Sequence, residues 1–239
     1  ADRLSVCKVD AGSGETLSVV CGAPNVFAGM RAPVALVGAR LPDGRKIRRS
    51  KIRGVESQGM LCSAAELGLG EDADGIMSLD ERAPVGEPLA AHLQLDDVVI
   101  DIELTPNRGD CLGISGVARE IGVINRVPVA GPDIQPMTAE VDDRFAVHLD
   151  APQHCARYVG RVIRDIDPGA RTPVWMQERL RRCGVRPISP VVDITNYVML
   201  ELGQPMHAFD LDALRGAIHV RMAQPDEALT LLDGNAITL

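Results

Sequence analysis

Short apolar runs separated by turn residues fill the first hundred positions of the chain. Their alternating or continuous hydrophobic character predicts β-strands. The predicted strands span 4–10, 16–23, 32–39, 45–54 and 59–63. The pair Asp43-Gly44, which alternating residues flank, predicts a tight hairpin. Five short strands in succession are typical of a small closed β-barrel, of which the oligonucleotide-binding (OB) fold is a common type.

Two helices are predicted in the middle of the chain. Ser63 and Glu66 have the spacing of a capping box, which predicts a short helix that ends at Gly68 or Gly70. A second helix is predicted at about 111–125, where apolar residues recur as a buried stripe would require. The members of that stripe are Leu112, Val117, Ile121 and Ile124.

Other elements are predicted around these helices. Residues 98–104 alternate apolar with acidic side chains, which predicts a half-buried strand. Residues 127–142 contain three prolines and are expected to be a linker. Residues 145–150 and 155–166 are strand-like, and an amphipathic helix is predicted between Pro173 and Gly184.

The last part of the chain continues the mixed pattern. Asp193 is suited to an N-cap and Gly203 to a C′ position, so we expect a helix of about nine residues between them. Further strands are predicted at 218–223 and 228–239. The second of these contains a hairpin signal at Asp233-Gly234 and stops soon after it. We therefore expect an α+β fold and a segment of a longer protein.

Composition limits the class of protein. The chain has 239 residues, of which 46% are hydrophobic, so two or three globular domains are expected. No run approaches the roughly 18 apolar residues that a membrane span needs, and the first residues lack the layout of a signal peptide. Six cysteines without a C-x-x-C pair favour reduced thiols over a zinc site. We expect a cytoplasmic protein that does not bind a membrane.

Charge is unevenly distributed along the chain. The net charge of −8 argues against a protein that coats nucleic acid with its whole surface. Eleven acidic residues lie between positions 66 and 103. Six basic residues occupy the preceding hairpin, namely Arg45, Lys46, Arg48, Arg49, Lys51 and Arg53. Such a patch attracts phosphates locally, although a solvated hairpin face explains the same pattern.

The apolar segment 191–210, VVDITNYVMLELGQPMHAFD, carries candidate chemistry. If Asp193 caps the helix, Thr195 and Asn196 lie in its first turn, where free N–H groups can hold an oxygen. The four residues after the helix can span about 13 Å, enough to return His207 to that end. A hydroxyl, an amide and an imidazole there can orient water for attack on an ester. No second metal ligand accompanies them. A capping Thr and a packed core His remain the alternatives.

Three passages together resemble one family. They are VCGAPNVFAGMRAPVALVGARLP with SKIRGVESQGMLCSAAELGL, then DIELTPNRGDCLGISGVAREI, then VVDITNYVMLELGQPMHAFD. In this order they resemble the β subunits of bacterial phenylalanyl-tRNA synthetases, and the resemblance covers essentially the whole chain. It implies a tRNA-binding OB-fold domain at 1–95, a partial α+β domain with a linker at 96–142, and the first half of a B3/B4-type editing domain at 143–239.

The resemblance also implies a function. In this family the editing domain hydrolyses tyrosine esterified to the phenylalanine tRNA, and Thr195, Asn196 and His207 match its Thr-Asn pair and downstream His. The residue that recognises the tyrosine hydroxyl would lie beyond Leu239, so the chain alone is expected to be inactive. The complete enzyme is expected to be an α2β2 tetramer with an α subunit, to bind tRNA(Phe), and to use ATP and Mg²⁺. We expect no cofactor or metal in this chain.

Alternatives to this interpretation remain open. A non-enzymatic tRNA-binding or chaperone protein built on the OB fold would explain residues 1–95, and a structural subunit would make the Thr-Asn-His group a matter of packing. The loop TPNRGDC has too few glycines for a phosphate-binding loop. Asn107, Arg108 and Asp110 within it are expected to form a structural corner between strand and helix, or to contact the partner subunit.

Overall fold

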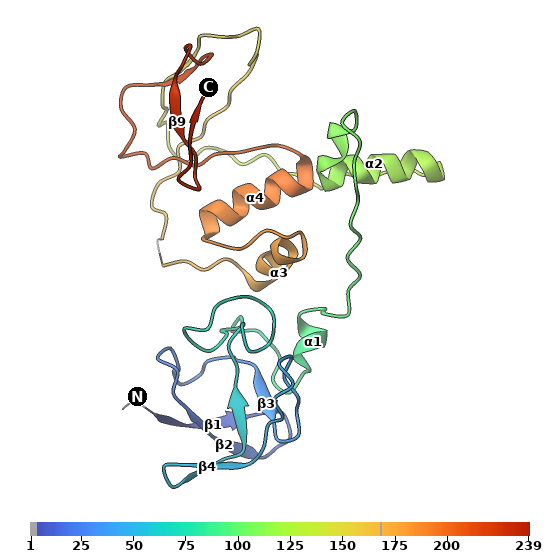
Figure 1. Ribbon diagram of the computed structural model, residues 1–239, viewed down its shortest axis with the longest axis vertical. Coiled ribbons are helices and arrows are strands. Elements are labelled where there is room, and N and C mark those ends of the chain that lie inside the picture. Colours follow the sequence, from blue (N-terminus) through green and yellow to red (C-terminus); the bar gives the residue numbers. More distant parts are fainter. Residues whose placement is uncertain (1–3, 168) are drawn as a thin grey trace.

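The computed structural model describes residues 4–167 and 169–239. Within these residues, the first part of the chain forms six short strands at one end of the molecule (Figure 1). Their bounds are β1 Ser5–Asp10, β2 Thr16–Cys21, β3 Val34–Leu36, β4 Ser50–Ile52, β5 Val55–Ser57 and β6 Gly59–Leu61. They pair antiparallel as β1 with β2, β3 with β6, and β4 with β5. The predicted strands are thus confirmed with shorter bounds, except at 45–54.

The paired strands surround a small core. Val19 of β2 and Cys62 have no exposed surface, and Ile47 is buried in contact with Cys62. Burial of such an aliphatic side chain stabilises the fold by about 2 kcal/mol. Single backbone bonds join the sheets, for example from the N–H of Gln58 to the carbonyl of Ser18 (2.8 Å). The described residues therefore form small antiparallel sheets around a core, and closure into a barrel stays a prediction.

The basic segment 45–54 contains a turn that the sequence reading missed. The hairpin at Asp43-Gly44 is confirmed, since Arg40 and Lys46 on either side of it form a β-bridge. The chain then reverses again at Arg53-Gly54, where φ is 48° and 87°, and so passes from β4 into β5. Two successive left-handed residues are what a tight hairpin requires. The single strand predicted here was wrong.

The capping box formed by Ser63 and Glu66 is confirmed, but the helix predicted after it is not. The N–H of Ser63 donates to Glu66 Oε2 (2.9 Å), and the N–H of Glu66 donates to Ser63 Oγ (3.2 Å). The following residues form turns, because Gly68 adopts φ 68° and ends the helical winding at once. A single turn does not overcome the cost of helix nucleation.

The segment 98–104 does not form the predicted strand. After the short helix α1 (Leu89–His92) it runs as an extended connection toward α2 (Figure 1). Val98, Val99 and Ile100 are 79%, 65% and 76% exposed. No other described segment pairs with this stretch, and a strand exists only through its partner.

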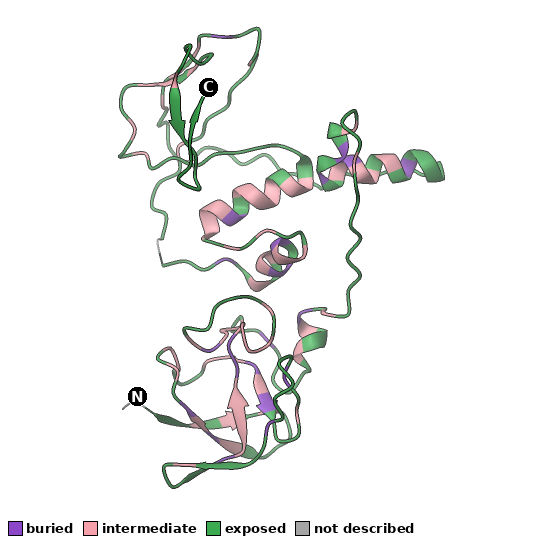
Figure 2. Cartoon of the chain, viewed as in Figure 1, coloured by how far each residue is buried: buried purple, intermediate pink, exposed green. Residues whose placement is uncertain are grey.

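The predicted helix near 111–125 is confirmed, but its buried stripe is not. A 3₁₀ turn, η1 (Gly109–Leu112), leads into α2 (Ile114–Asn125). Leu112, Ile121 and Ile124 are 73%, 53% and 69% exposed, and Figure 2 shows most of α2 as exposed or half-buried. The amphipathic pattern is present in the sequence, yet no described element covers its apolar face.

The loop before α2 is a structural corner, but the strand that it was predicted to tie to the helix does not form. The guanidinium of Arg108 bonds Glu120 of α2 (2.6 Å) and Asp110 (3.2 Å). These bonds lower the pKa of both carboxyl groups. Asn107 accepts a hydrogen bond from the hydroxyl of Thr105 (2.7 Å). Arg108 therefore ties the loop to the helix that follows it.

The last part of the chain places two helices between parallel strands. Its elements are β7 Val147–Leu149, α3 Val174–Arg182, α4 Pro190–Leu202, β8 Ile218–Val220, β9 Ala228–Thr230 and β10 Ala236–Thr238. β7 pairs parallel with β8, which requires a long crossover, and α3 and α4 lie in that crossover. β9 and β10 pair antiparallel on either side of Asp233-Gly234, so the predicted hairpin is confirmed.

Two further stretches contain neither helix nor strand. Residues 127–142 are irregular and almost entirely exposed, as expected of a linker. The strand predicted within 155–166 was wrong, because these residues are mostly exposed and pair with no described segment. None of the helices in the described residues combines the length and apolar character needed to cross a membrane.

We predict that Gly116→Ala destabilises the chain by about 2 kcal/mol. A Cβ at this position would lie 2.6 Å from the carbonyl carbon of Asp110 and closer still to its oxygen. Alanine favours a helix by about 1 kcal/mol over glycine, but the collision with backbone outweighs that gain. Urea unfolding measures the difference. Gly109→Ala is the matched control, since its Cβ meets nothing within 4 Å, and an equal loss in both variants would contradict the prediction.

Candidate functional site

Helix α4 begins earlier than the sequence predicts. Ser189 is its N-cap, and Pro190 occupies the first turn, where its fixed φ suits a helix and its missing N–H costs nothing. Asp193 therefore lies inside the helix rather than at its cap. Thr195 and Asn196 lie in the second turn, away from the free N–H groups of the helix start. The anion-holding helix end that the sequence suggested for this pair was wrong.

Asp193 instead pins the helix to its neighbours. Its side chain is almost fully buried, with 1% of the residue exposed. One carboxylate oxygen accepts the hydroxyl of Thr172, just before α3, and the other accepts the N–H of Ile188 (2.8 Å). A buried carboxylate is costly without such partners. Both oxygens are satisfied here, so the start of α4 is fixed against the segment that leads into α3.

Thr195 and Asn196 are half-buried on this fixed helix. The hydroxyl of Thr195 donates to the backbone carbonyl of Val192 (2.8 Å). That bond sets the orientation of the side chain while leaving the oxygen lone pairs available as acceptors. Thr195 is therefore held in a fixed orientation, and Asn196 follows it on the second turn of α4.

The far end of α4 packs against the beginning of α2. Gly203 ends the helix with φ 72°, as predicted. A Cβ added to Gly113, the N-cap of α2, would lie 2.7 Å from the backbone nitrogen of Gly203. The hydroxyl of Ser115 also donates to the carbonyl of Glu201 (2.8 Å). The two sequence passages that contain the loop TPNRGDC and the Thr-Asn pair therefore meet in space (Figure 1).

His207 lies in an exposed segment beyond Gly203. Residues 204–210 are all exposed, and the imidazole of His207 contacts the ring of Phe209 with centroids 4.4 Å apart. Within the part of the chain that the structure describes, no hydrogen bond or ion pair joins His207 to Thr195 or Asn196. The structure thus brings Thr195 and Asn196 together and does not bring the imidazole into bonding contact with them.

A cluster on α3 and α4 was missed by the sequence reading. Trp175 and Tyr197 meet edge to face with ring centroids 5.5 Å apart. The guanidinium of Arg179 lies 5.4 Å from the centre of the indole and donates to the hydroxyl of Tyr197 (2.6 Å). The available signal was the i, i+4 spacing of Trp175 and Arg179 on a predicted amphipathic helix.

The basic hairpin is partly neutralised by nearby carboxylates. Arg45 pairs with Asp43 (3.2 Å) and Glu66 (3.5 Å), and Arg49 pairs with Glu56 (3.2 Å). Arg53 forms part of the tight turn into β5. The remaining cations, which have no ion pair among the described residues and are exposed, are Lys46, Arg48 and Lys51. Among the predicted RNA-binding residues, these three have positive charges that no carboxylate of the described residues neutralises.

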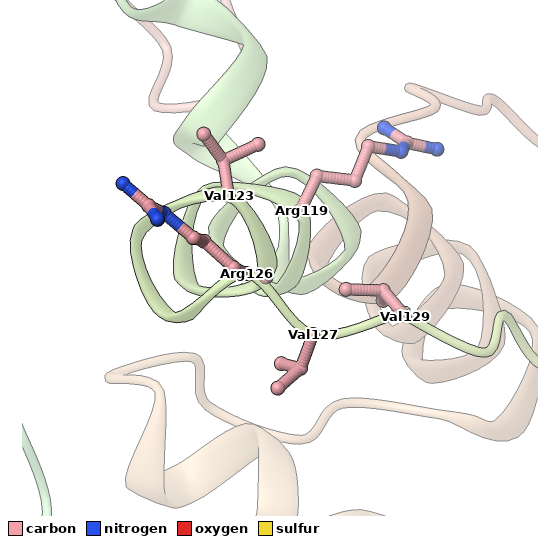
Figure 3. A pocket seen from close by; sticks show the side chains of 6 residues that line it. Arg119, Val123, Arg126, Val127 and Val129 are labelled. Carbon is pink, nitrogen blue, oxygen red and sulfur yellow. The ribbon is translucent and has the colours of Figure 1, made fainter.

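Two hollows occur elsewhere on the surface. One, of about 430 Å³, is lined by Phe27 and Arg31, and Phe27 is 63% exposed. The other, of about 570 Å³, lies at the end of α2 (Figure 3). There the guanidinium groups of Arg119 and Arg126 point away from one another, with Val123 between them. This second hollow therefore gathers no convergent polar groups, unlike a typical ligand site.

Among the described residues, no three His, Cys, Asp or Glu side chains lie together as a metal site would require. The six cysteines are free thiols, of which Cys21, Cys62 and Cys111 are buried.

Comparison with known proteins gives the class of protein. Residues 1–88 match a family model described as "Putative tRNA binding domain", and residues 154–239 match one described as "B3/4 domain". The chain thus combines the tRNA-binding and B3/4 units that the resemblance implies for its two ends.

Individual relatives narrow this class to one family. The chain is 57% identical to the phenylalanine–tRNA ligase β subunits of Methylococcus capsulatus and Nitrosococcus oceani, and 55% identical to that of Pectobacterium atrosepticum. Each match covers 100% of the chain and 30% of the relative. Along its whole length the chain is thus homologous to phenylalanine–tRNA ligase β subunits, which confirms the resemblance, and it spans about 30% of their length.

We predict that Asp193→Ala lowers the free energy of unfolding by about 2–4 kcal/mol. The change leaves the buried hydroxyl of Thr172 and the N–H of Ile188 without their acceptor. Urea denaturation of the 239-residue chain measures it. Asp142→Ala removes an exposed carboxylate with no recorded bond, so it should stay within about 0.5 kcal/mol of the parent. A similar loss in both variants would show that Asp193 is not a special anchor.

Proposed function

We propose that this chain contributes tRNA contact and half of an editing site to a phenylalanine–tRNA ligase. The observation that carries the proposal is the similarity to β subunits over every residue of the chain. The two matched family models support a division of labour between the ends of the chain. In this proposal 1–95 is the OB-fold tRNA-binding domain, 96–142 a partial domain with a linker, and 143–239 the first half of the editing domain.

The proposed reaction is hydrolysis of tyrosine from the phenylalanine tRNA. Tyrosine differs from phenylalanine by one hydroxyl, and an apolar synthetic site rejects such an addition only about 10²-fold. A second site that bonds the hydroxyl can remove the error after synthesis. The acidic group for that bond belongs to the remainder of the complete protein in this proposal.

Thr195 and Asn196 would hold the reacting oxygen atoms. The Thr195 hydroxyl, already oriented by Val192, and the Asn196 amide are suited to position water or the developing oxyanion. His207 would transfer the proton. The rise from Thr195 to Gly203 is about 12 Å, and the four residues beyond Gly203 reach about 13 Å when extended. Closure of the segment 204–210 back over α4 would therefore complete the group.

The partial domain at 96–142 requires covering by the rest of the protein in this proposal. Two observations support this part of the proposal. The stretch from Val98 to Ile100 pairs with no described strand, and the apolar face of α2 is uncovered. An exposed apolar surface of this extent marks an interaction site. A further strand beside 98–104 and an element over Ile121 and Ile124 would complete it.

The activity of the complete enzyme is also part of the proposal. An α subunit in an α2β2 assembly would activate phenylalanine with ATP and Mg²⁺ and transfer it to tRNA(Phe) in the cytoplasm. The alternative, a non-enzymatic tRNA-binding or chaperone protein, accounts for residues 1–88 but leaves the B3/4 match at 154–239 without a role.

We predict that His207→Ala slows hydrolysis of mischarged Tyr-tRNA(Phe) by the complete enzyme about 10²-fold or more, because the proton relay is lost. Phenylalanine activation should be unchanged. His154→Ala is the matched control, since His154 is exposed and its ring makes no recorded contact. An unchanged deacylation rate in His207→Ala, with wild-type enzyme active, would rule out the catalytic role.

We predict that the triple variant of Lys46, Arg48 and Lys51 to Ala weakens tRNA binding mainly at low salt. Each lost phosphate contact should reduce the slope of log K against log salt by about 0.7–0.9. A filter-binding titration of the complete enzyme at several salt concentrations measures it. Arg144→Ala removes an exposed cation outside residues 1–95 and serves as the control. An unaltered slope in the triple variant would remove the basic hairpin from the tRNA interface.

A further inference from the structure

The Trp175–Arg179–Tyr197 cluster is a candidate binding surface, here called the aromatic platform. Trp175 is the only tryptophan of the chain and is 52% exposed. It is nevertheless fixed in place, because Tyr197 meets it edge to face and Arg179 lies 5.4 Å from its ring centre. Arg179 is itself held by its bond to the hydroxyl of Tyr197 (2.6 Å). The side chains are thus ordered before any ligand binds, which reduces the entropy cost of binding.

The charge of α3 favours an anionic ligand. Glu178 is the only acidic residue of α3, and it is buried and paired with Arg181 (2.7 Å) and Arg182 (3.6 Å). Arg179 is exposed and forms no ion pair of its own among the described residues. The carboxylate of Glu201 reaches it only through the hydroxyl of Tyr197, which donates to Glu201 (3.4 Å). Most of its guanidinium donors remain available after the one bond to Tyr197.

Two further exposed arginines flank α3 in the sequence. Arg171 precedes α3 and Arg186 follows it, and neither forms an ion pair within residues 4–167 and 169–239. An ordered aromatic ring beside an exposed arginine is the combination that binds single-stranded nucleic acid, through base stacking and phosphate contacts. A neutral protein surface would use the aromatic rings equally well but would not account for the excess of positive charge.

The platform lies within one helical turn of the proposed editing residues. Tyr197 directly follows Asn196 on α4, and Asp193 fixes that helix to the segment before α3. Successive residues on a helix point in different directions, so an RNA strand on the platform reaches the Thr195–Asn196 pair by following the surface around α4. The strand that carries the ester in a mischarged tRNA is its unpaired 3′ end.

We propose that the aromatic platform binds an unpaired nucleotide of the tRNA acceptor end, with the base stacked on Trp175 and a phosphate on Arg179. This role rests on the proposed editing function and adds a positioning site to it. The platform takes no part in the chemical step, so it acts on the affinity for mischarged tRNA.

The test uses deacylation of mischarged tRNA by the complete enzyme. Trp175→Ala should raise KM about tenfold and leave kcat unchanged, since one stacking contact is removed. Trp175→Phe should restore most of the affinity, because any aromatic face stacks on a base. Arg179→Gln should reduce the salt slope of tRNA binding by about 0.7, the contribution of one single-strand phosphate.

Controls separate this proposal from folding and from the proposed function. Tyr158→Ala removes another partly exposed aromatic side chain (37%), which makes no ring contact with the platform, and should leave KM unchanged. An unaltered KM in Trp175→Ala overturns the platform while editing stands. Loss of subunit assembly with unaltered KM assigns the surface to a protein partner and also overturns it. If wild-type enzyme does not deacylate the tRNA, the proposed function itself fails.

Discussion

Helix α4 is held at both ends, and the arrangement of α2 and α3 beside it depends on this. At its start the buried carboxylate of Asp193 accepts bonds from Thr172 and Ile188. At its end Gly203 packs against Gly113 without room for a side chain on the latter. The first contact joins α4 to α3, and the second joins it to α2. Because a helix is stiff, fixing both ends also fixes the backbone between them, including the positions of Thr195 and Asn196. The rigid element on which the proposed chemistry rests is therefore defined by groups that take no part in it.

The sequence predicted local elements well and their surroundings poorly. Hairpins at Asp43-Gly44 and Asp233-Gly234 were correct because a tight turn is decided by a few adjacent residues. The corner around Arg108 was correct in part for the same reason, although the strand predicted before it does not form. The strand at 98–104 and the stripe on α2 were wrong because burial depends on a distant partner that periodicity alone does not identify. The prediction that Asp193 is the N-cap of α4 was wrong. Ser189 competes for that position, and because Pro190 follows it, Ser189 begins the helix more favourably. Its buried bond to Thr172 joins residues far apart in sequence, which no local pattern reveals.

The two proposed RNA contacts solve the same electrostatic problem differently. The chain is acidic overall, with a net charge of −8. The basic hairpin concentrates cations in consecutive positions and leaves part of them unpaired. Helix α3 instead buries its only acidic residue, Glu178, against two arginines. The carboxylate of Glu178 therefore does not neutralise a third arginine, Arg179. In both places the positive charge is local, and at physiological salt a charge acts over about 8 Å. An acidic subunit can therefore carry basic contact surfaces without becoming a general nucleic-acid binder.

The exposed stretch from Val98 to Ile102 has a consequence for the handling of this chain. It offers unsatisfied backbone groups and contiguous β-branched side chains, which is the template for pairing between separate molecules. Acidic side chains at Asp101 and Glu103 oppose such pairing by charge repulsion. Where nothing covers this stretch, the chain is therefore prone to self-association through residues 98–102, most strongly at high concentration.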